Sequence, residues 1–198
     1  MCNCCNSSTK DVHQRIWLFY QIISWLKTPK KVFSVRSEEQ NLCPCCRGAM
    51  GVIGSRKRKY INDVGEKIIL VIRRLRCLQC HRIHHELPDL LVPYKHYGRD
   101  SIEAVLSGDA TLTVAADEST ICRWRNWFFR WANHFLGCLI SIHTRENHGS
   151  VEEKIRLPQS PLQRIWHFVG DAPGWLARVV RPVVNSNFWI HTQLAFLS

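Results

Sequence analysis

Four cysteines form two closely spaced pairs, and this spacing is the strongest chemical signal in the sequence. Cys43 and Cys46 enclose two residues, and so do Cys77 and Cys80. Each pair can turn two thiolates toward one ion, and two such pairs supply the four ligands of a tetrahedral structural zinc site. The predicted zinc ligands are therefore Cys43, Cys46, Cys77 and Cys80.

Other ligands and other ions fit the same pattern. One neighbouring side chain could replace a cysteine, as in a Cys₃His site. The candidates are Cys45, His81, His84 and His85. A rubredoxin-like iron site uses the same four thiolates. Disulfides or inert buried thiols are the remaining alternatives. Residues 1–8 show no basic segment followed by an apolar one, so we expect a chain kept in the reducing cytoplasm, which argues against disulfides.

A β-hairpin is expected between the two cysteine pairs. Two β-prone runs, 58–61 and 67–74, flank the turn-forming residues 62–66, and the second run leads directly to Cys77. A module of this size buries too little apolar surface to fold alone, and metal–thiolate bonds can supply on the order of 10 kcal/mol. Residues 41–92 are therefore predicted to form a zinc ribbon.

The charge balance is the most unusual feature of the composition. The chain of 198 residues has 27 Lys and Arg against 16 Asp and Glu, a net charge of +11, with an ordinary hydrophobic content of 45%. Much of the excess flanks the hairpin turn, in Arg56, Lys57, Arg58, Lys59, Arg73, Arg74 and Arg76. We expect these residues to converge on one patch that binds DNA phosphates. A solvated face is the alternative, and the hairpin has no broad apolar face for membrane insertion.

A helical region is expected over residues 93–144, after a proline-punctuated connector at 87–94. A short helix over 101–106 ends at Gly108, and after a tight connection a long helix begins within 117–120. The long helix has a continuous apolar face, formed by Ile121, Trp124, Phe128, Trp131, Phe135 and Cys138.

The opposite face of this long helix is polar and basic. Its residues are Ser119, Thr120, Arg123, Asn126 and Arg130. A short helix, a tight connection and a polar first turn match a helix-turn-helix, whose second helix enters the DNA major groove. An ordinary solvated face is the alternative. The expected fold class is therefore α+β, a small zinc-ribbon hairpin followed by a helix-turn-helix-like region.

Both ends of the chain are expected to add helices. In the C-terminal segment 145–198, Ser160 and Pro161 begin a helix that Gly170 ends, and a second short helix over 173–181 stops at Pro182. These helices could pack on the long helix or form a homodimer surface. In the extension 1–40, the apolar run 11–27 is too short to span a bilayer comfortably and predicts a core or docking helix, with an interfacial membrane helix as the alternative.

These residues resemble a family of bacterial proteins associated with mobile elements. The resemblance covers about residues 40–198 and is carried by CPCC at 43–46, GSRKR at 54–58, LRCLQC at 75–80, IHHELP at 83–88 and STICRW at 119–124. The order of zinc ribbon and helix-turn-helix is also similar to the N-terminal DNA-binding region of insertion-sequence transposases. The resemblance implies binding to double-stranded DNA of a transposable element, as a transcriptional regulator or as an accessory factor beside a separate transposase.

Catalysis is not expected on this chain. A full transposase of this kind would carry a carboxylate triad on a further domain and use two metal ions for phosphoryl transfer. Beyond the expected helix-turn-helix the acids are Glu146, Glu152, Glu153 and Asp171, without alternating strands to mount them. No glycine-rich phosphate loop, nucleophile elbow or metalloprotease signature is present. The alternative function is a zinc-ribbon adaptor that binds protein partners and has no affinity for DNA.

Overall fold

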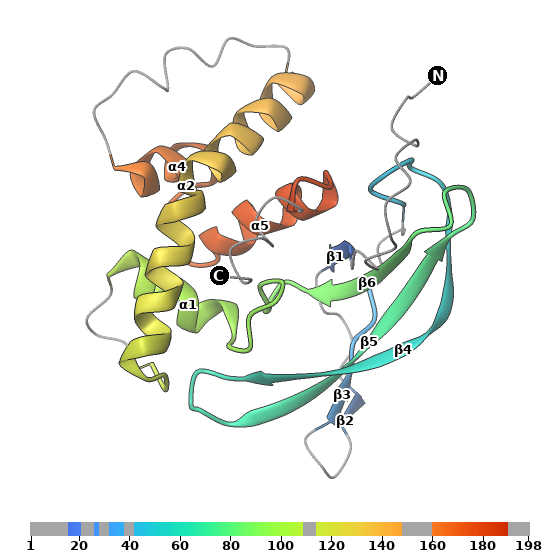
Figure 1. Ribbon diagram of the computed structural model, residues 1–198, viewed down its shortest axis with the longest axis horizontal. Helices are drawn as coiled ribbons and strands as arrows, with labels where there is room; N and C mark the ends of the chain where they lie inside the picture. Colours follow the sequence, from blue (N-terminus) through green and yellow to red (C-terminus); the bar gives the residue numbers. More distant parts are fainter. Residues whose placement is uncertain are drawn as a thin grey trace.

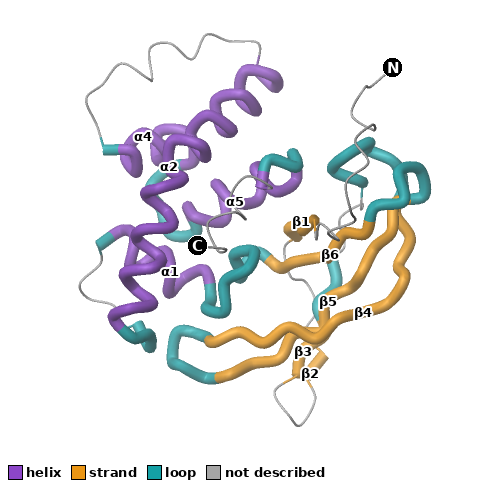
Figure 2. The backbone as a smooth tube through the Cα atoms, viewed as in Figure 1, coloured by secondary structure: helices purple, strands orange, loops and turns teal. Residues whose placement is uncertain are grey.

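The chain folds into a sheet and a helical layer that pack together, an α+β arrangement (Figure 1). The computed structural model describes residues 16–20, 26–27, 32–37, 42–108, 114–147 and 160–189. The strands are β1 (Ile16–Tyr20), β2 (Leu26–Lys27), β3 (Val32–Ser34), β4 (Met50–Ile61), β5 (Lys67–Cys77) and β6 (Ile83–Pro88). The helices are α1 (Arg99–Ser107), α2 (Glu118–Asn147), α4 (Pro161–Val169) and α5 (Trp175–Asn185). The helices gather on one side of the strands (Figure 2).

The predicted hairpin is confirmed, and it is longer than the sequence pattern indicated. β4 and β5 pair antiparallel from Met50 opposite Cys77 to Ile61 opposite Lys67. The turn between them closes through the Asn62 side chain, which accepts a hydrogen bond from the Glu66 amide at 2.7 Å. On its other edge β5 pairs with β6 near the cysteines and with β3 near the turn. Within the described sheet, β4 pairs with β5 alone and is therefore an edge strand.

The N-terminal extension contributes a strand where a helix was expected. Residues Ile16–Tyr20 form β1, which pairs parallel with β6. The prediction of a helix through 11–27 is therefore wrong at β1 and at β2, and the other residues of that run lie outside the described part. A short apolar run suits a buried strand as well as a helix. The edge of β6 offers unpaired backbone groups, and pairing with β1 satisfies them.

β5 buries its two ends on opposite faces of the sheet. Side chains alternate along a strand, so Leu70 and Ile72 face the helices while Leu75 and Cys77 face the other way. Leu70 and Ile72 belong to the main hydrophobic core, which is shared by the sheet and the helices. Leu75 instead packs in a separate small cluster with Met50. The turn end of the hairpin is thus held by the core, whereas the cysteine end has little apolar packing.

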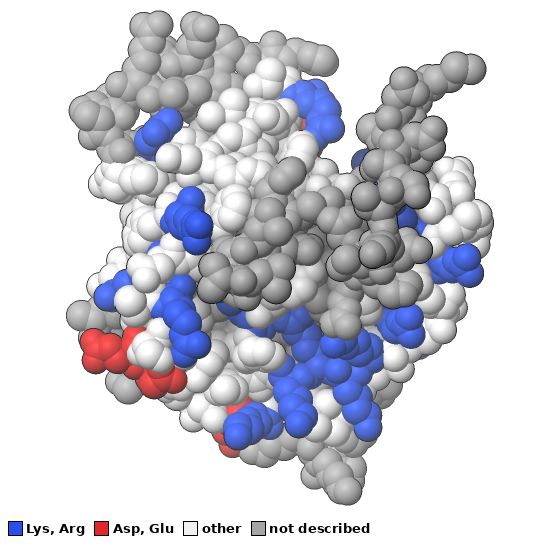
Figure 3. Space-filling view, viewed as in Figure 1, with Lys and Arg blue, Asp and Glu red and all other residues white. Residues whose placement is uncertain are grey.

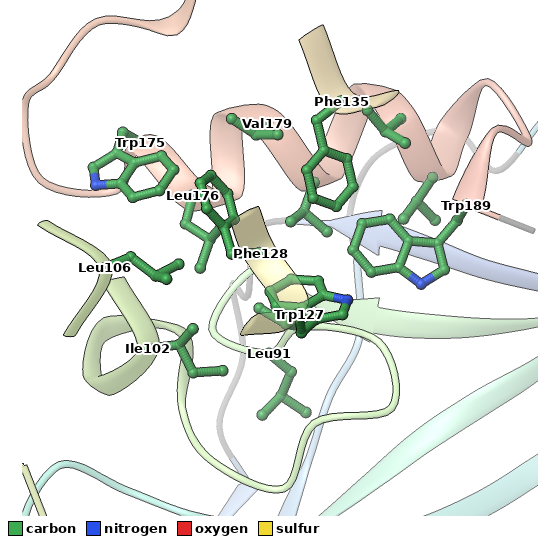
Figure 4. Close-up of a cluster of buried hydrophobic side chains, with 14 of the residues drawn as sticks. Leu91, Ile102, Leu106, Trp127, Phe128, Phe135, Trp175, Leu176, Val179 and Trp189 are labelled. Atoms are coloured by element: carbon green, nitrogen blue, oxygen red, sulfur yellow. The ribbon is translucent and has the colours of Figure 1, made fainter. Parts of the chain in front are cut away.

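The predicted apolar face of the long helix is confirmed in α2. Phe128 and Phe135 are fully buried, and Trp124 is 4% exposed. The Phe128 ring meets Trp175 of α5 edge-to-face with centroids 5.4 Å apart, and Phe135 stacks on Trp189 at 5.6 Å. These aromatic pairs join α2 to the C-terminal segment (Figure 4). None of the helices in the described part of the chain combines the length and the apolar character needed to cross a membrane.

The connection between α1 and α2 differs from the expected tight turn. α1 ends at Ser107 with Gly108 in the left-handed conformation, as predicted, but α2 begins only at Glu118. A helix-turn-helix joins its helices through about three or four residues. The longer connection here does not match that motif, and the expectation of a tight connection is wrong. Sequence placed the end of α1 and the start of α2 correctly, but the segment between them is longer than the turn of a helix-turn-helix.

The C-terminal helices follow the predicted starts and differ at one end. Ser160 and Gln163 form a reciprocal capping box at the start of α4, which Gly170 ends. Pro182 was expected to stop the last helix, but it lies inside α5. Val183 and Val184 beyond the proline are at most 1% exposed. Their burial favours continuing the helix and offsets the hydrogen bond that proline cannot donate.

Candidate metal centre and basic surface

The four predicted cysteine ligands lie together at one end of the hairpin. Their sulfur atoms are all within 4.8 Å of one another. The Cys43 and Cys80 sulfurs are 3.5 Å apart, and those of Cys46 and Cys77 are 3.4 Å apart. Four sulfurs around one ion at bond lengths of about 2.3 Å would be about 3.8 Å apart. The group therefore fits a single tetrahedral metal ion.

The two cysteine pairs sit in the same backbone turn. Arg47 and His81, the residues that follow each pair, both have positive φ, at 61° and 57°. The Cys43 amide donates to the Gly48 carbonyl at 2.9 Å, and the Cys77 amide donates to the Arg82 carbonyl at 3.0 Å. In both pairs the hydrogen bond spans the same number of residues. The repeated turn aims both pairs of thiols at one point.

The thiols of this group differ in how readily they ionise. Burial opposes ionisation of Cys77, but hydrogen bonds from the backbone amides of Cys80 and Gln79 outweigh it and lower the pKa to about 6. Burial raises the pKa of Cys43, and it also raises the pKa of Cys80. Metal binding requires thiolates, so a divalent ion would have to displace the protons that burial retains.

Of the other candidate ligands, two lie beside this group. Cys45 and His84 form a second group of potential ligands with Cys43, again within 4.8 Å. His84 Nε2 lies 3.4 Å from Cys43 Sγ. His81 is exposed and His85 is buried, and neither belongs to a group of metal ligands among the described residues.

The predicted basic patch divides between two faces of the sheet. Arg56 and Arg58 are partly buried on the face toward the helices, while Lys57 and Lys59 are exposed on the other. Arg56 lies opposite Ile72 and Lys57 opposite Val71, which fixes this assignment. The expectation of one converging patch is therefore wrong, because adjacent residues of a strand point in opposite directions. Arg74 and Arg76 share the face of Arg56.

Two of the predicted phosphate-binding arginines are engaged within the protein. Arg58 donates to the Val92 and Lys95 carbonyls at 3.1 and 2.8 Å. Burial, together with the nearby charge of Arg56, lowers the Arg58 pKa to about 10. Arg73 makes two hydrogen bonds to the Glu86 carboxylate, at 2.5 and 2.6 Å. Sequence could not reveal these partners because they come from segments that pair only in the fold.

The polar residues at the start of α2 bond mainly to one another. Asp117 accepts hydrogen bonds from the Ser119 hydroxyl at 2.6 Å and from the Thr120 amide at 2.7 Å. These bonds lower the pKa of Asp117 to about 2, and the bond from Ser119 has the largest effect. Arg123 donates to the Ser119 hydroxyl at 2.9 Å, and Asn126 donates to the Cys122 sulfur at 3.6 Å.

Arg130 is exposed further along the same helix. This polar face of α2 thus remains at the surface, and Asp117 caps the start of the helix.

Lys95 is a buried cation that the sequence did not single out. It is 6% exposed, and its Nζ lies 4.1 Å from the centre of the Trp127 ring. Burial lowers the Lys95 pKa from 10.5 to about 7. The folded chain therefore binds fewer protons than the unfolded chain between pH 7 and 10.5. The free energy of unfolding should rise with pH across that window.

Replacing Lys95 with Met should remove this pH dependence. In the wild type, the free energy of unfolding should rise by at most about 1.4 kcal/mol per pH unit, the limit for one proton. The variant should lose this rise. Denaturant unfolding of wild type and Lys95→Met at several pH values from about 7 to 9 measures it. The same pH dependence in both proteins would show that Lys95 keeps its proton when folded.

Several apolar side chains near the cysteines are exposed, and the sequence analysis did not single them out. They are Leu42, Val52, Ile53 and Leu78, with 38%, 56%, 45% and 66% of their surface exposed. Leu42 forms an isolated antiparallel β-bridge with Ala49, and the Leu78 amide donates a hydrogen bond to the Ala49 carbonyl at 3.0 Å. Single exposed apolar residues are common on protein surfaces, and these four lie in the segments next to the cysteines.

Comparison with known proteins identifies one similarity. Residues 43–124 match a family model described as a domain of unknown function (DUF6431). The matched segment contains all four cysteines, the β4–β5 hairpin, β6, α1 and the first turns of α2. No curated protein and no solved structure matches the chain. The four-cysteine group and the hairpin therefore lie within the segment that matches this family model.

Proposed function

We propose that this protein is a zinc-dependent DNA-binding protein whose β4–β5 hairpin contacts DNA. The observation that carries the proposal is the charge of the two strands beside the cysteine group, which contain no acidic residue. Their basic residues are Arg56, Lys57, Arg58, Lys59, Lys67, Arg73, Arg74 and Arg76. Cations concentrated on one rigid element favour a polyanion, because each phosphate contact releases counterions.

Zinc is the metal that we assign to the four-cysteine group. Cys43, Cys46, Cys77 and Cys80 would hold it as a zinc ribbon, and the fit of their spacing to one tetrahedral ion supports this. The bound ion would supply structure rather than chemistry, because four thiolates leave no open coordination position. Iron fits the same donors, so elemental analysis of the purified protein decides between the two metals.

The exposed edge of the sheet is the surface that we assign to DNA. β4 is the edge strand. Along it, Lys57 and Lys59 lie on one face of the sheet and Arg56 lies on the other. Lysine and arginine side chains gather over β4 and β5, and others lie over the helical layer on the same visible face (Figure 3). Arg58 and Arg73, which have internal partners, are left out of the DNA-binding surface.

The start of α2 is less suited to DNA than the hairpin. Asp117 and Glu118 are exposed there, and their negative charge opposes an approaching phosphate. A base-reading role for Ser119, Thr120, Arg123 or Asn126 remains a prediction from sequence. Arg130 would contribute only to non-specific attraction.

The link to a transposable element rests on the sequence resemblance alone. In this proposal the protein acts as a transcriptional regulator of the element or as an accessory factor for a separate transposase, as a monomer or a homodimer. A zinc-stabilised DNA-binding module suits either role. Preference for the DNA that flanks its own gene over random duplex would support this part of the proposal.

The test is binding of a fluorescent duplex to the zinc-loaded protein across a salt series. We expect affinity to fall steeply with salt, and the slope of log affinity against log salt should decrease by about 1 for each phosphate contact removed. The variants are Lys57→Gln with Lys59→Gln, and Arg56→Gln with Arg74→Gln. Both pairs should weaken binding to all sequences alike.

Arg145→Gln is the matched control. Arg145 is exposed near the far end of α2, and removing its charge changes the net charge without touching the hairpin. Unchanged affinity in both hairpin variants would contradict the proposal. Lysines on an edge strand also prevent association of sheet edges, so aggregation of the variants with unchanged DNA affinity would assign them that role instead.

A protein adaptor is the second candidate function, and the exposed apolar residues favour it. Leu42, Val52, Ile53 and Leu78 would form the contact surface for a partner polypeptide. Such patches mark protein interfaces more often than DNA interfaces, which are polar and positively charged. Failure of the zinc-loaded protein to bind DNA at low salt would put this function first.

A further inference from the structure

The metal centre contains more potential ligands than one tetrahedral ion can use. Cys43 belongs to the four-cysteine group and also to the group with Cys45 and His84, whose ligand atoms lie within 4.8 Å of one another. His84 Nε2 is 3.4 Å from Cys43 Sγ. One sulfur and one nitrogen on a tetrahedral zinc ion lie about 3.5 Å apart at ordinary bond lengths. The spacing of these two atoms therefore suits a shared ion.

We propose that Cys43, Cys45 and His84 form a second zinc site, in which Cys43 Sγ bridges two ions. The first ion is held by the four cysteines, and the second takes the three protein ligands. Its fourth position is open to water, because Cys45 is partly exposed. This inference rests on the four-cysteine metal site and does not depend on DNA binding.

The burial of His84 supports this site. The side chain is 0% exposed, and its place in β6 is fixed by pairing opposite Leu75 of β5. Its Nδ1 has no hydrogen-bond partner among the described residues, so the polar contact of the ring is with Cys43. Burying an imidazole with a single polar contact is costly. A metal bond at Nε2 offsets part of that cost.

Charge balance gives a second argument. Four thiolates around one divalent ion leave a formal charge of about −2. A second divalent ion with one more thiolate and a neutral imidazole changes this to about −1. The Arg82 Nη1 lies 3.6 Å from Cys45 Sγ, and its positive charge balances the remainder. Two ions therefore bring this end of the hairpin closer to neutrality than one.

The experiment is a metal count on the full-length protein without DNA. The parent protein carries Cys2→Ser, Cys4→Ser and Cys5→Ser, because these thiols could bind zinc elsewhere. Zinc per chain is measured by elemental analysis after dialysis, and cobalt titration follows the thiolate–metal absorption. We expect two ions per chain in the parent and one in Cys45→Ser, with the four-cysteine ion retained.

Further variants make the result specific. Cys122→Ser removes an exposed thiol on α2 and should keep two ions. His84→Gln should keep one ion, as Cys45→Ser does. If His84→Gln does not fold, Cys45→Ser alone decides the question. One ion in the parent, or two in Cys45→Ser, would overturn the second site. Loss of all metal from Cys45→Ser would also overturn it, because Cys45 would then serve the first ion.

Discussion

Removing the metal should open the cysteine end of the β4–β5 hairpin and leave the helical layer folded. Besides backbone pairing with β6, the cysteine end has only the small apolar contact of Leu75 with Met50. The metal–thiolate bonds, worth about 10–16 kcal/mol in small zinc modules, should therefore dominate its stability. The turn end is held differently. Leu70 and Ile72 lie in the core that the helices share, and this packing does not need the ion.

Hydrogen exchange with and without a chelator measures this expectation. Amides of residues 43–55 and 73–84 should lose protection, while those of α2 and α5 keep it. Cys77→Ser should have the same effect and weaken metal binding by more than about 100-fold, since changes outside the ligand shell already cost about 10- to 100-fold. Cys122→Ser is the control. Global unfolding on chelation would show that the helical core depends on the metal, contrary to this account.

Replacing Arg73 with Met should destabilise the protein by about 3–5 kcal/mol, the usual cost of removing one partner of a buried ion pair. Glu86 is fully buried and accepts hydrogen bonds from Arg73 and, at 2.8 Å, from the Ser37 amide. Without the guanidinium, its carboxylate would remain buried with the positive partner gone. Arg73 thus has a structural role, although its sequence context suggested DNA binding.

Arg74→Met is the matched comparison, because it removes the same charge one residue away on the opposite face of β5. It should change the free energy of unfolding by less than about 1 kcal/mol and should weaken DNA binding. Denaturant unfolding and duplex binding on both variants separate the two roles. Equal stability of Arg73→Met and Arg74→Met would show that the Arg73–Glu86 pair contributes little to folding.

The elements predicted correctly are those with local signals. The hairpin turn is marked by Asn62 and Gly65, α1 by Gly108, and α4 by Ser160 with Pro161. In each case the residue acts on its own backbone, so the signal needs no knowledge of the rest of the chain. The apolar face of α2 is likewise a property of one helix.

The elements missed depend on partners far along the chain. β1 is a strand because β6 offers it an edge. Periodicity alone does not separate a buried strand from a helix over residues 16–20, although their β-branched and aromatic side chains favour a strand. Pro182 stays within α5 because the valines beyond it are buried in the core that the sheet and the helices share. The same reason explains the basic residues. Sequence identified their charge, but only the fold shows that Arg58 bonds to the Val92 and Lys95 carbonyls and that Arg73 pairs with Glu86.

The cysteine group was the part of the site most open to prediction. Two-residue spacings specify a turn with two convergent thiols, and two such turns suffice to indicate a metal site. The closeness of His84 to Cys43 could not be predicted from local spacing, because the pairing of β6 with β5 brings the two residues together. Cys45 was visible as a candidate from its place inside the first pair, but its distance from His84 was not.

The proposal that the hairpin contacts DNA is tested most directly by mapping the contact. Lysine acetylation of the zinc-loaded protein, with and without a random duplex at low salt, is read out by mass spectrometry. The account predicts that DNA slows modification of Lys57 and Lys59 and that high salt restores it. DNA binding with unchanged reactivity at both lysines would contradict it.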